Sequence, residues 1–540
     1  MQHSYNVERF KETFESEFTY LNGFMRNVFR RGNEPALICP LTNRTWTYKT
    51  LNDEANRLAS SLMARGVTSD DVVMHALLNS AEFVFTYIAT HKIGCVNAPL
   101  NYRLSGGEIA LLIDQSKPKA LIYDAEFEKI ISEALRSVHH RPEIIMADLN
   151  NEMDAPEGVV TYRDFVKDGS PENPVRKDKP SIYDETTRFF TSGTTNLPKA
   201  VPVNDINEVL SAHDVIMHFP LSPKDVTMNL TPWFHRGGLH SGGPCPTLYI
   251  GGTMVILRDF TPRLALQYVS LYHITFLIGA PTVIDMLCRI QETNPRDISS
   301  LHGIVLMGSP LDKEPCKRYM KVLTPNIFNG YGTTETFWNV FLRPYDLPDK
   351  AGYAGGACTD DDVRVVRVDT TKHVSPDELV PMDKKTVGEV VIFAPNKSTF
   401  AYYDNPKTTE EKFHNGWLYT GDLATWDEHA YITIIGRKDD MIVSAGENIY
   451  PVQVESILNE HPKVAESLVF GIPDPKRGSV IAALIRPSDP SLTEKEMKQF
   501  CMNHPMLAPY KRPRIFRFVK ELPHNATGKL LHKLPPDFKF

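Results

Sequence analysis

Hydrophobic and polar residues recur with two different periods along the chain, which predicts a mixture of helices and strands. Between residues 50 and 65, apolar side chains return every three or four positions, as on one face of a helix. Thr50 with Asp53 resembles a capping box, and Gly66 marks the end of this helix. Short apolar runs predict strands at residues 119–123, 188–190, 253–257, 304–307 and 326–328. The alternation favours an α/β fold.

A second, smaller domain is predicted at the C-terminal end. The chain has 540 residues, roughly three to four times the usual size of one domain. The polar segment 436–440 marks a boundary, and strands at 466–470 and 480–485 and a helix opened by Thr493 follow it. We predict an N-terminal domain of residues 1–436, a hinge at 437–440 and a C-terminal domain of residues 441–540.

Composition and charge exclude several classes of protein. Hydrophobic residues make up 42% and charged residues 23%, as in ordinary globular proteins. The formal charge of -7 argues against a nucleic-acid binder, which needs a basic surface. No apolar run reaches the roughly 18 residues of a membrane-spanning helix, and the first twenty residues lack the apolar core of a signal peptide. Seven dispersed cysteines suggest reduced thiols, so we expect a cytoplasmic protein with no integral membrane segment.

The segment Thr191-Ser192-Gly193-Thr194-Thr195-Asn196-Leu197-Pro198-Lys199 is the most informative one. It follows the apolar pair Phe189-Phe190, so a strand runs into a loop that is rich in hydroxyl groups and ends in a lysine. Backbone N–H groups, hydroxyl donors and one cation together suit phosphate oxygens. The loop does not match the GxxxxGK[ST] phosphate-binding pattern. From composition alone, an ordinary flexible turn has about equal weight.

Five further motifs follow this loop in a fixed order. They are Asn329-Gly330-Tyr331-Gly332-Thr333-Thr334-Glu335, Tyr419-Thr420-Gly421-Asp422, Gly436-Arg437-Lys438-Asp439-Asp440, Ser444-Ala445-Gly446-Glu447-Asn448-Ile449-Tyr450-Pro451 and Thr527-Gly528-Lys529. The ordered series resembles the adenylate-forming superfamily of acyl-CoA synthetases, luciferases and peptide-synthetase adenylation domains, over about residues 47–533. The resemblance implies a luciferase-like fold, with a large N-terminal domain of α/β subdomains and a small mobile α+β C-terminal domain. Asn196 and Ala200 stand where relatives usually have glycine.

The resemblance implies a binding site for ATP and Mg²⁺. Glu335 would hold Mg²⁺ together with Thr194, Thr334 would contact the α-phosphate, and Tyr331 would stack on adenine. Asp422 would accept hydrogen bonds from the ribose, with Arg437 beside it. The full set of implied ATP- or AMP-binding residues is Thr191, Ser192, Gly193, Thr194, Thr195, Lys199, Gly308, Ser309, Pro310, Tyr331, Gly332, Thr333, Asp422 and Arg437.

The resemblance also assigns roles to the C-terminal domain. Lys529 matches the catalytic lysine that bridges the substrate carboxylate and the α-phosphate, although by itself it could be one cation of a basic tail. Asp439 matches the hinge about which the small domain rotates between the two half-reactions. The implied coenzyme A contacts are Ser444, Gly446 and Glu447.

The acyl pocket is expected around the segment 232–238. Trp233 and His235 resemble the family motif that borders the acyl group, and Gly330 and Trp338 are the other implied pocket residues. Amino-acid-activating relatives usually place an aspartate here, so its absence disfavours a peptide-synthetase function. The aromatic residues suggest a short, branched, alicyclic or aromatic monocarboxylic acid, although they could equally belong to the core.

The leading functional hypothesis is an AMP-forming acyl-CoA synthetase. A luciferase-like oxygenase and a non-catalytic sensor of acyl adenylate are the alternatives, and retention of Lys529, Glu335 and Asp422 disfavours the sensor. The expected partners are a small carboxylic acid and coenzyme A, with no nucleic acid. The sequence leaves open the direction of the reaction, a homodimeric state and regulation by acetylation of Lys529.

Overall fold

The chain folds into two units, which are described separately. The computed structural model describes residues 4–150, 152–191, 198–369, 372–444, 447–474, 478–505, 507–524 and 530. The large unit comprises Met1–Ala351, Cys358–Asp362 and Phe393–Gly416, and the small unit comprises Gly352–Ala357, Val363–Ile392 and Trp417–Phe540. The predicted α/β class, with a large N-terminal and a small C-terminal part, is confirmed. The domain limits at 436 and 441 and the hinge at 437–440 stay predictions.

The first sheet of the large unit has seven strands in the order β7-β6-β5-β3-β4-β8-β9. All neighbours are parallel except β8 and β9. The strands are β3 (Val72–Ala76), β4 (Val96–Pro99), β5 (Ala120–Asp124), β6 (Glu143–Ala147), β7 (Val160–Thr161), β8 (Glu185–Thr191) and β9 (Lys199–Asn204). Every residue of β3 and β5 is buried, as expected for parallel strands covered on both faces.

The large unit contributes eight neighbouring strands to the second sheet, in the order β15-β14-β13-β12-β10-β11-β1-β2. The six strands from β14 to β1 are parallel, and β15 and β2 run antiparallel to β14 and β1. The strands are β1 (Pro35–Cys39), β2 (Arg44–Thr47), β10 (Val226–Asn229), β11 (Thr253–Val255), β12 (Phe276–Gly279), β13 (Gly303–Met307), β14 (Ile327–Thr333) and β15 (Phe337–Leu342). The strand predicted at 326–328 is therefore longer, because β14 continues through the glycine-containing motif.

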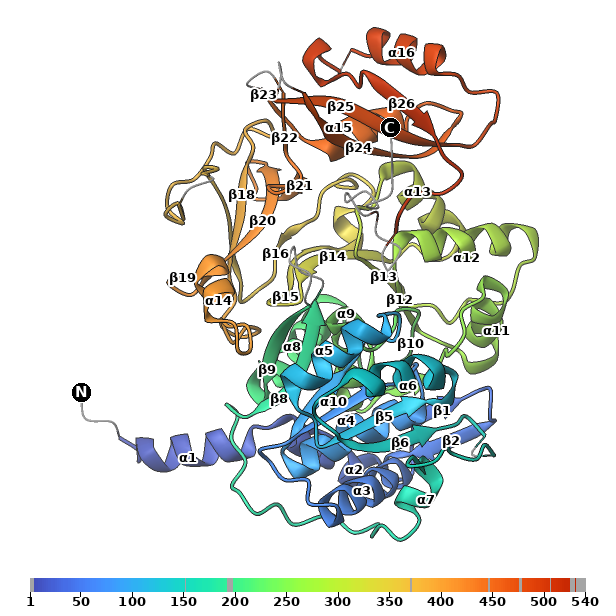
Figure 1. Cartoon of the computed structure of the whole chain (residues 1–540), viewed down its shortest axis with the longest axis vertical. Helices are drawn as coiled ribbons and strands as arrows, with labels where there is room; N and C mark the ends of the chain where they lie inside the picture. The colour runs from blue at the N-terminus through green and yellow to red at the C-terminus, as the bar shows by residue number, and fades with distance from the viewer. Residues whose placement is uncertain are drawn as a thin grey trace. The chain divides into compact units, whose positions relative to one another are not determined.

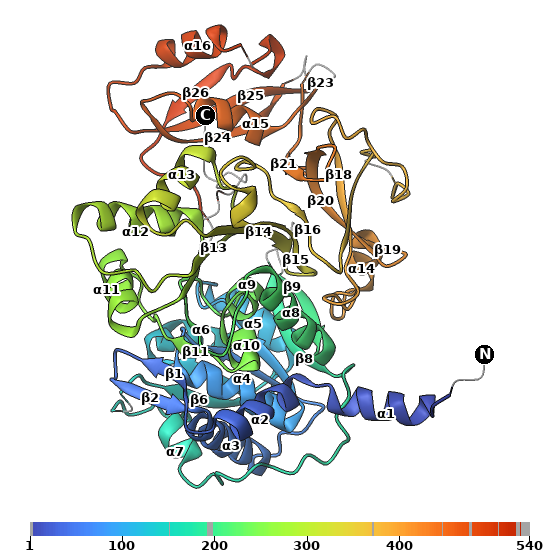
Figure 2. The same cartoon turned by 180° about the vertical axis from the view of Figure 1, so that it is seen from behind.

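Helices connect the parallel strands of both sheets (Figures 1 and 2). Those of the large unit are α1 (Val7–Glu17), α2 (Tyr20–Arg31), α3 (Tyr48–Ala64), α4 (Ala81–Ile93), α5 (Gly106–Ser116), α6 (Glu128–Ser137), α7 (Tyr162–Val166), α8 (Asp205–His218), α9 (Arg236–His240), α10 (Pro244–Ile250), α11 (Pro262–Tyr272), α12 (Pro281–Thr293), α13 (Lys313–Val322) and α14 (Pro406–Lys412). Helix α4 is buried along its whole length, so it forms part of the core rather than a surface layer.

The helix predicted at 50–65 corresponds to α3, but its N-terminal cap was placed wrongly. The capping box is formed by Thr47 and Thr50, each of which accepts the backbone N–H of the other. Tyr48 is fully buried and begins the first turn, so the helix starts two residues before the predicted cap. Gly66 follows with φ +82°, the left-handed conformation that ends the helix.

Both sheets place turns at the carboxyl ends of their parallel strands, where α/β proteins bind ligands. In the first sheet, β8 ends at Thr191 and pairs with the antiparallel edge strand β9, which begins at Lys199. In the second, β14 turns into the antiparallel strand β15, and β13 ends beside it. The phosphate-loop motif therefore begins and ends on paired strands of the first sheet, and the motif 329–335 ends in the β14–β15 turn.

The small unit contains two further sheets. Strands β17 (Asp362–Val366), β18 (Gly388–Phe393), β20 (Trp417–Trp426) and β21 (Ile432–Arg437) form one of them. Strands β24 (Val464–Asp474), β25 (Gly478–Pro487) and β26 (Ile515–Phe518) form the other. A separate hairpin of β22 (Ile442–Ser444) and β23 (Glu447–Ile449) precedes helices α15 (Pro451–Leu458) and α16 (Glu494–Asn503). Thr493 caps α16 as predicted.

Within the described part of the chain, no helix combines the length and the apolar character that crossing a bilayer requires.

Candidate functional site

The first and last residues of the phosphate-loop motif belong to the β8–β9 hairpin. Thr191 and Lys199 are paired directly across this hairpin, so the structure brings the two ends of the motif together. Ala200, which replaces the usual glycine, is buried opposite Phe190 and pairs within the sheet. Ser192, Gly193, Thr194 and Thr195 lie outside the described residues.

Tyr402 connects the lysine of this motif to the predicted Mg²⁺ ligand. Its hydroxyl donates a hydrogen bond to Oε1 of Glu335 at 2.5 Å. The Nζ of Lys199 lies 5.4 Å from the centroid of the same ring, within the range of a cation–π contact. Sequence reasoning missed Tyr402. The one signal in the sequence is the adjacent pair Tyr402-Tyr403. In the structure, the guanidinium carbon of Arg188 lies 3.4 Å from the ring centroid of Tyr403.

The motif 329–335 forms the end of β14 and the turn into β15. Tyr331, Gly332 and Thr333 belong to the strand, and Thr334 and Glu335 form the turn. A Cβ atom on Gly332 would lie 1.6 Å from the carbonyl oxygen of Phe337, so only glycine fits at this position. The hydroxyls of Thr333 and Thr336 lie 3.0 Å apart and close the turn.

The predicted nucleotide-binding segment 308–310 lies next to this hairpin. Gly308, Ser309 and Pro310 follow the carboxyl end of β13, which pairs in parallel with β14 so that Met307 is opposite Gly330. Gly308 has φ +87°, a conformation that favours glycine.

The expected acyl-pocket residues are distributed between this region and the core. The ring of His235 packs at a tilt against that of Phe234, with the ring centroids 4.1 Å apart. Gly237, two residues further on, lies so close to Met307 that a Cβ would be 3.1 Å from the sulfur. Trp233 is 1% exposed and packs against Phe83 inside the large unit. The predicted acyl segment 232–238 thus contacts β13 through Gly237, while the side chain of Trp233 lies in the core.

His235 is a neutral aromatic side chain at ordinary pH. Its Nε2 atom is buried and has no hydrogen-bond partner within the described residues. Burial, with a smaller contribution from the nearby charge of Arg103, lowers the pKa of His235 to about 4. This favours a role in lining the pocket over a role in proton transfer.

Trp338 and Gly330 lie on facing strands of the β14–β15 hairpin. A Cβ on Gly330 would be 3.0 Å from the indole nitrogen of Trp338, so the glycine makes room for this ring. The indole is buried among Phe219, Phe337 and Phe341.

A fully buried lysine holds the backbone of this hairpin. The Nζ of Lys397 bonds to Asp214 at 3.0 Å and to Asp361 at 2.8 Å, and it also donates to the carbonyl oxygen of Trp338. The three charged side chains are at most 1% exposed. The two carboxylates raise the pKa of Lys397 against the opposing effect of burial, so the ammonium stays charged.

We expect the substitution Lys397→Met to lower the free energy of unfolding by about 3–5 kcal/mol, because it leaves two buried carboxylates without their cation. Urea unfolding followed by fluorescence would measure the change. Lys317→Met is the control, because its ion pair with Glu314 is exposed and worth at most about 1 kcal/mol. Equal midpoints for the two variants would contradict this prediction.

Within the small unit, the two predicted ribose-binding residues contact one another. Asp422 on β20 is paired with Arg437 at the end of β21, and the guanidinium donates to Oδ1 of the carboxylate at 2.8 Å. The following residue, Lys438, is fixed by its N–H to the carbonyl of Gly421 and by its Nζ to Glu389, at 2.7 and 2.8 Å. The Asp422 carboxylate is therefore oriented by its ion pair with Arg437.

The other residues predicted in this unit lie in turns. Asp439 is exposed in the turn after β21. Ser444 and Glu447 are paired at the end of the β22–β23 hairpin, and the hydroxyl of Ser444 donates to the carbonyl of Ser479 at 2.6 Å. Gly446, Thr527, Gly528 and Lys529 lie outside the described residues.

Family models match most of the chain. Residues 24–403 match the model described as AMP-binding enzyme, and residues 453–529 match the AMP-binding enzyme C-terminal domain. A feruloyl-CoA synthase from Amycolatopsis sp is 30% identical over 487 residues, which cover 90% of this chain and 92% of that protein. A 4-chlorobenzoate–CoA ligase from Arthrobacter sp is 28% identical, with 93% and 92% covered.

Solved structures share the fold over nearly the whole chain. An anthranilate CoA ligase in complex with anthranoyl-AMP aligns with a TM-score of 0.84 and 25% identity, over 95% of this chain and 96% of that one. The o-succinylbenzoate CoA synthetase from Bacillus subtilis, in complex with its acyl-adenylate intermediate, aligns with a TM-score of 0.82 and 28% identity, over 96% and 98% of the two chains.

Proposed function

Because this chain belongs to the family of AMP-binding enzymes and is an acid–thiol ligase, we propose that it uses ATP and Mg²⁺ to join a short, alicyclic or aromatic monocarboxylic acid to coenzyme A in the cytoplasm. The observation that carries the proposal is the group of Lys199, Tyr402 and Glu335. It places a cation and a carboxylate from two separate motifs around one ring, at the carboxyl ends of parallel strands.

The proposed reaction has two steps. In the first, a carboxylate oxygen of the acid attacks the α-phosphorus of ATP, and pyrophosphate leaves with the electron pair of the broken P–O bond. In the second, the thiolate of coenzyme A attacks the carbonyl carbon of the acyl adenylate, and AMP leaves. The first step brings two anions together, so positive charge must lie between them.

The residues of this chain divide these tasks between them. Lys199 and the loop before it bind the β- and γ-phosphates, and Thr334 contacts the α-phosphate. Asp422, oriented by Arg437, accepts hydrogen bonds from the ribose hydroxyls. The carboxylate of Glu335 is the hard oxygen ligand that Mg²⁺ prefers, and the ion would neutralise phosphate charge.

Several features support an aromatic or compact acid. The predicted acyl segment carries the neutral ring of His235, which packs at a tilt against Phe234, and Trp338 lies beside Gly330. Relatives at similar identity include an indoleacetate–CoA ligase from Aromatoleum aromaticum and a butyrate–CoA ligase from Arabidopsis thaliana. The proposed range covers both kinds of acid.

A panel of carboxylic acids, assayed with ATP and Mg²⁺ and with or without coenzyme A, tests this function. We expect pyrophosphate release with at least one aromatic or short acid, and equal amounts of AMP and thioester when coenzyme A is present. Oxygen consumption and light emission from the adenylate would instead indicate an oxygenase. Absence of adenylate formation with every acid would overturn the proposal.

A further inference from the structure

Arg236 has an unusual position for a charged residue, because it is 2% exposed and lies next to the predicted acyl-pocket residue His235. Its two terminal nitrogens donate to two backbone carbonyls, those of Thr334 and Lys397, both at 2.7 Å. Nη2 also lies 3.4 Å from the hydroxyl of Ser211. Thr334 and its neighbour Glu335 form the turn predicted to contact the α-phosphate and Mg²⁺. Arg236 therefore holds the backbone of this turn directly.

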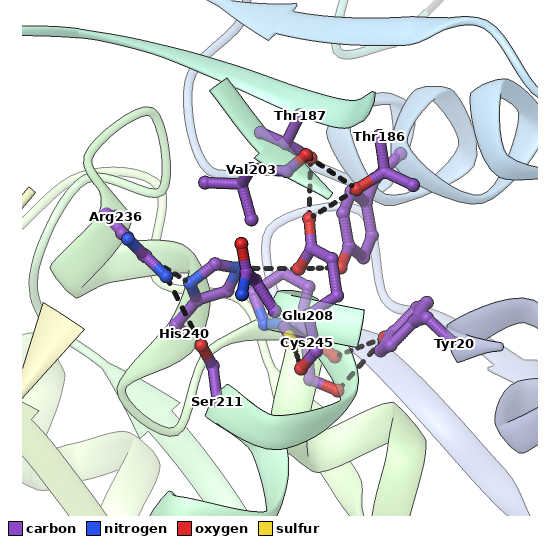
Figure 3. Close-up of polar contacts among 12 residues, drawn as sticks. Tyr20, Thr186, Thr187, Val203, Glu208, Ser211, Arg236, His240 and Cys245 are labelled. Atoms are coloured by element: carbon purple, nitrogen blue, oxygen red, sulfur yellow. Dashed lines mark hydrogen bonds and ion pairs between the residues drawn. The ribbon is translucent and has the colours of Figure 1, made fainter. Parts of the chain in front are cut away.

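A buried acid–imidazole pair in turn holds Arg236 (Figure 3). The Nε atom of Arg236 donates to Nδ1 of His240 at 3.2 Å, and Nε2 of the same imidazole donates to Glu208 at 2.6 Å. Because Nδ1 accepts this hydrogen bond, the imidazole is neutral with its hydrogen on Nε2. Burial lowers the pKa of His240, in agreement with this tautomer.

The same pair connects Arg236 to the other nucleotide-binding hairpin. Glu208 accepts hydrogen bonds from Thr187 on β8 at 2.7 Å and from Tyr87 on α4 at 2.9 Å. Strand β8 runs directly into the phosphate-loop motif. A continuous chain of polar contacts therefore links β8, α8, α9 and the turn of the β14–β15 hairpin, as Figure 3 shows for its first part.

The buried positive charge of Arg236 depends on all of these contacts. Burial lowers the pKa of Arg236 to about 10, while the carboxylates of Glu208 and Glu335 act in the opposite direction, so the guanidinium stays charged at neutral pH. A buried cation is stable only when hydrogen bonds and a counter-charge replace its water. Two carbonyls, an imidazole and the Glu208 carboxylate supply these here.

Two other roles for this cluster fit the contacts less well. Ligand atoms of Glu208, His240 and Cys245 lie within 4.8 Å of one another, the spacing of a metal site. Both nitrogens of His240 are already engaged by Arg236 and Glu208, so the imidazole has no lone pair for a metal. Glu208 and His240 are 0% exposed, which disfavours proton exchange with a substrate.

We propose that Arg236 is a positioning residue for the adenylation half-reaction, in which its guanidinium holds the Thr334–Glu335 turn and is itself held by the Glu208–His240 pair. The inference rests on the proposed function of the site. It predicts that loss of the two-carbonyl contact slows the attack on the α-phosphorus, because a displacement of about 1 Å can cost on the order of 10²-fold in rate.

The test is the substitution Arg236→Lys, which keeps the charge but cannot donate to both carbonyls and His240 in one plane. We expect kcat for ATP–pyrophosphate exchange to fall about 10- to 100-fold, with the KM for ATP changed less than about threefold. The rate of thioester formation from a supplied acyl adenylate should stay within about twofold of wild type. Arg258→Lys is the control, since the side chain of Arg258 is only 3% exposed and bonds only to Asp124 and Glu126 among the described residues.

The outcomes separate this inference from the proposed function. Wild-type protein that forms no acyl adenylate overturns the proposed function. If the wild type is active and Arg236→Lys slows both half-reactions equally, only the positioning role is overturned. The same holds if the variant slows neither half-reaction. If Arg236→Lys does not fold, as judged by its melting curve, Glu208→Gln replaces it. This amide keeps the shape but removes the counter-charge, and adenylation alone should fall about fivefold. An unchanged ratio of the two half-reactions in Glu208→Gln would overturn the role.

Discussion

Replacing Lys529 by alanine is expected to lower the rate of acyl-adenylate formation on the order of 10²–10³-fold or more. The acid and the α-phosphate are both negatively charged, so their approach depends on a cation placed between them. The family resemblance of the segment Thr527-Gly528-Lys529 implies that Lys529 performs this task. The rate of the thioester step should be retained, because in that step the thiolate of coenzyme A attacks a neutral carbonyl carbon. ATP–pyrophosphate exchange measures the first step, and thioester release from supplied acyl adenylate measures the second.

Lys520→Ala is the matched control for this experiment. Lys520 is an exposed lysine of the same C-terminal basic segment, and its loss removes the same charge from the chain. The control should keep both half-reactions. An Lys529→Ala variant that adenylates as fast as Lys520→Ala would show that the bridging cation lies elsewhere, and would restore the simpler interpretation of Lys529 as part of a basic tail.

The regular elements of the fold could be predicted because their signals are local. Burial on both faces makes β5 and β13 continuous apolar runs, and the one-sided apolar face of α3 repeats with the helical period. The cap of α3 was misplaced by three residues because Thr47 and Thr50 are both good caps. Only the burial of Tyr48 decides between them.

The candidate site residues could be predicted from sequence motifs. The side-chain contacts that fix the positions of these motifs in the fold could not be predicted. Thr191, Lys199, Asp422 and Arg437 occur in recognisable strings, and the structure pairs them across neighbouring strands. Tyr402 comes from a segment without such a string, and Arg236 lies inside the predicted acyl segment 232–238, whose motif gave it no role. Their partners are distant in sequence, 67 residues for Tyr402 with Glu335 and 98 for Arg236 with Thr334. Such pairings depend on the order of strands in the sheets, which no local pattern encodes.

The substitution Asp439→Pro is expected to separate the two half-reactions, with adenylation kept and thioester formation abolished. A hinge must change its backbone dihedrals at one or two residues, and proline fixes φ near −65°. Asp439 is exposed in the turn after β21, and within the described residues its backbone N–H makes no hydrogen bond that proline would remove. The next residue, Asp440, does donate to the carbonyl of Arg437, so proline there would break the turn itself.

Asp439→Ala separates the loss of backbone freedom from the loss of the carboxylate. Alanine leaves φ free, so this variant should retain both half-reactions, while Asp439→Pro should accumulate acyl adenylate in the presence of coenzyme A. Adenylate and thioester, quantified together by chromatography over a single turnover, distinguish the two. If alanine and proline block the thioester step equally, the side chain matters and the hinge lies elsewhere. If proline lowers both half-reactions with an unchanged melting curve, rotation at this turn is needed for the first step as well, and the predicted division between the steps is wrong.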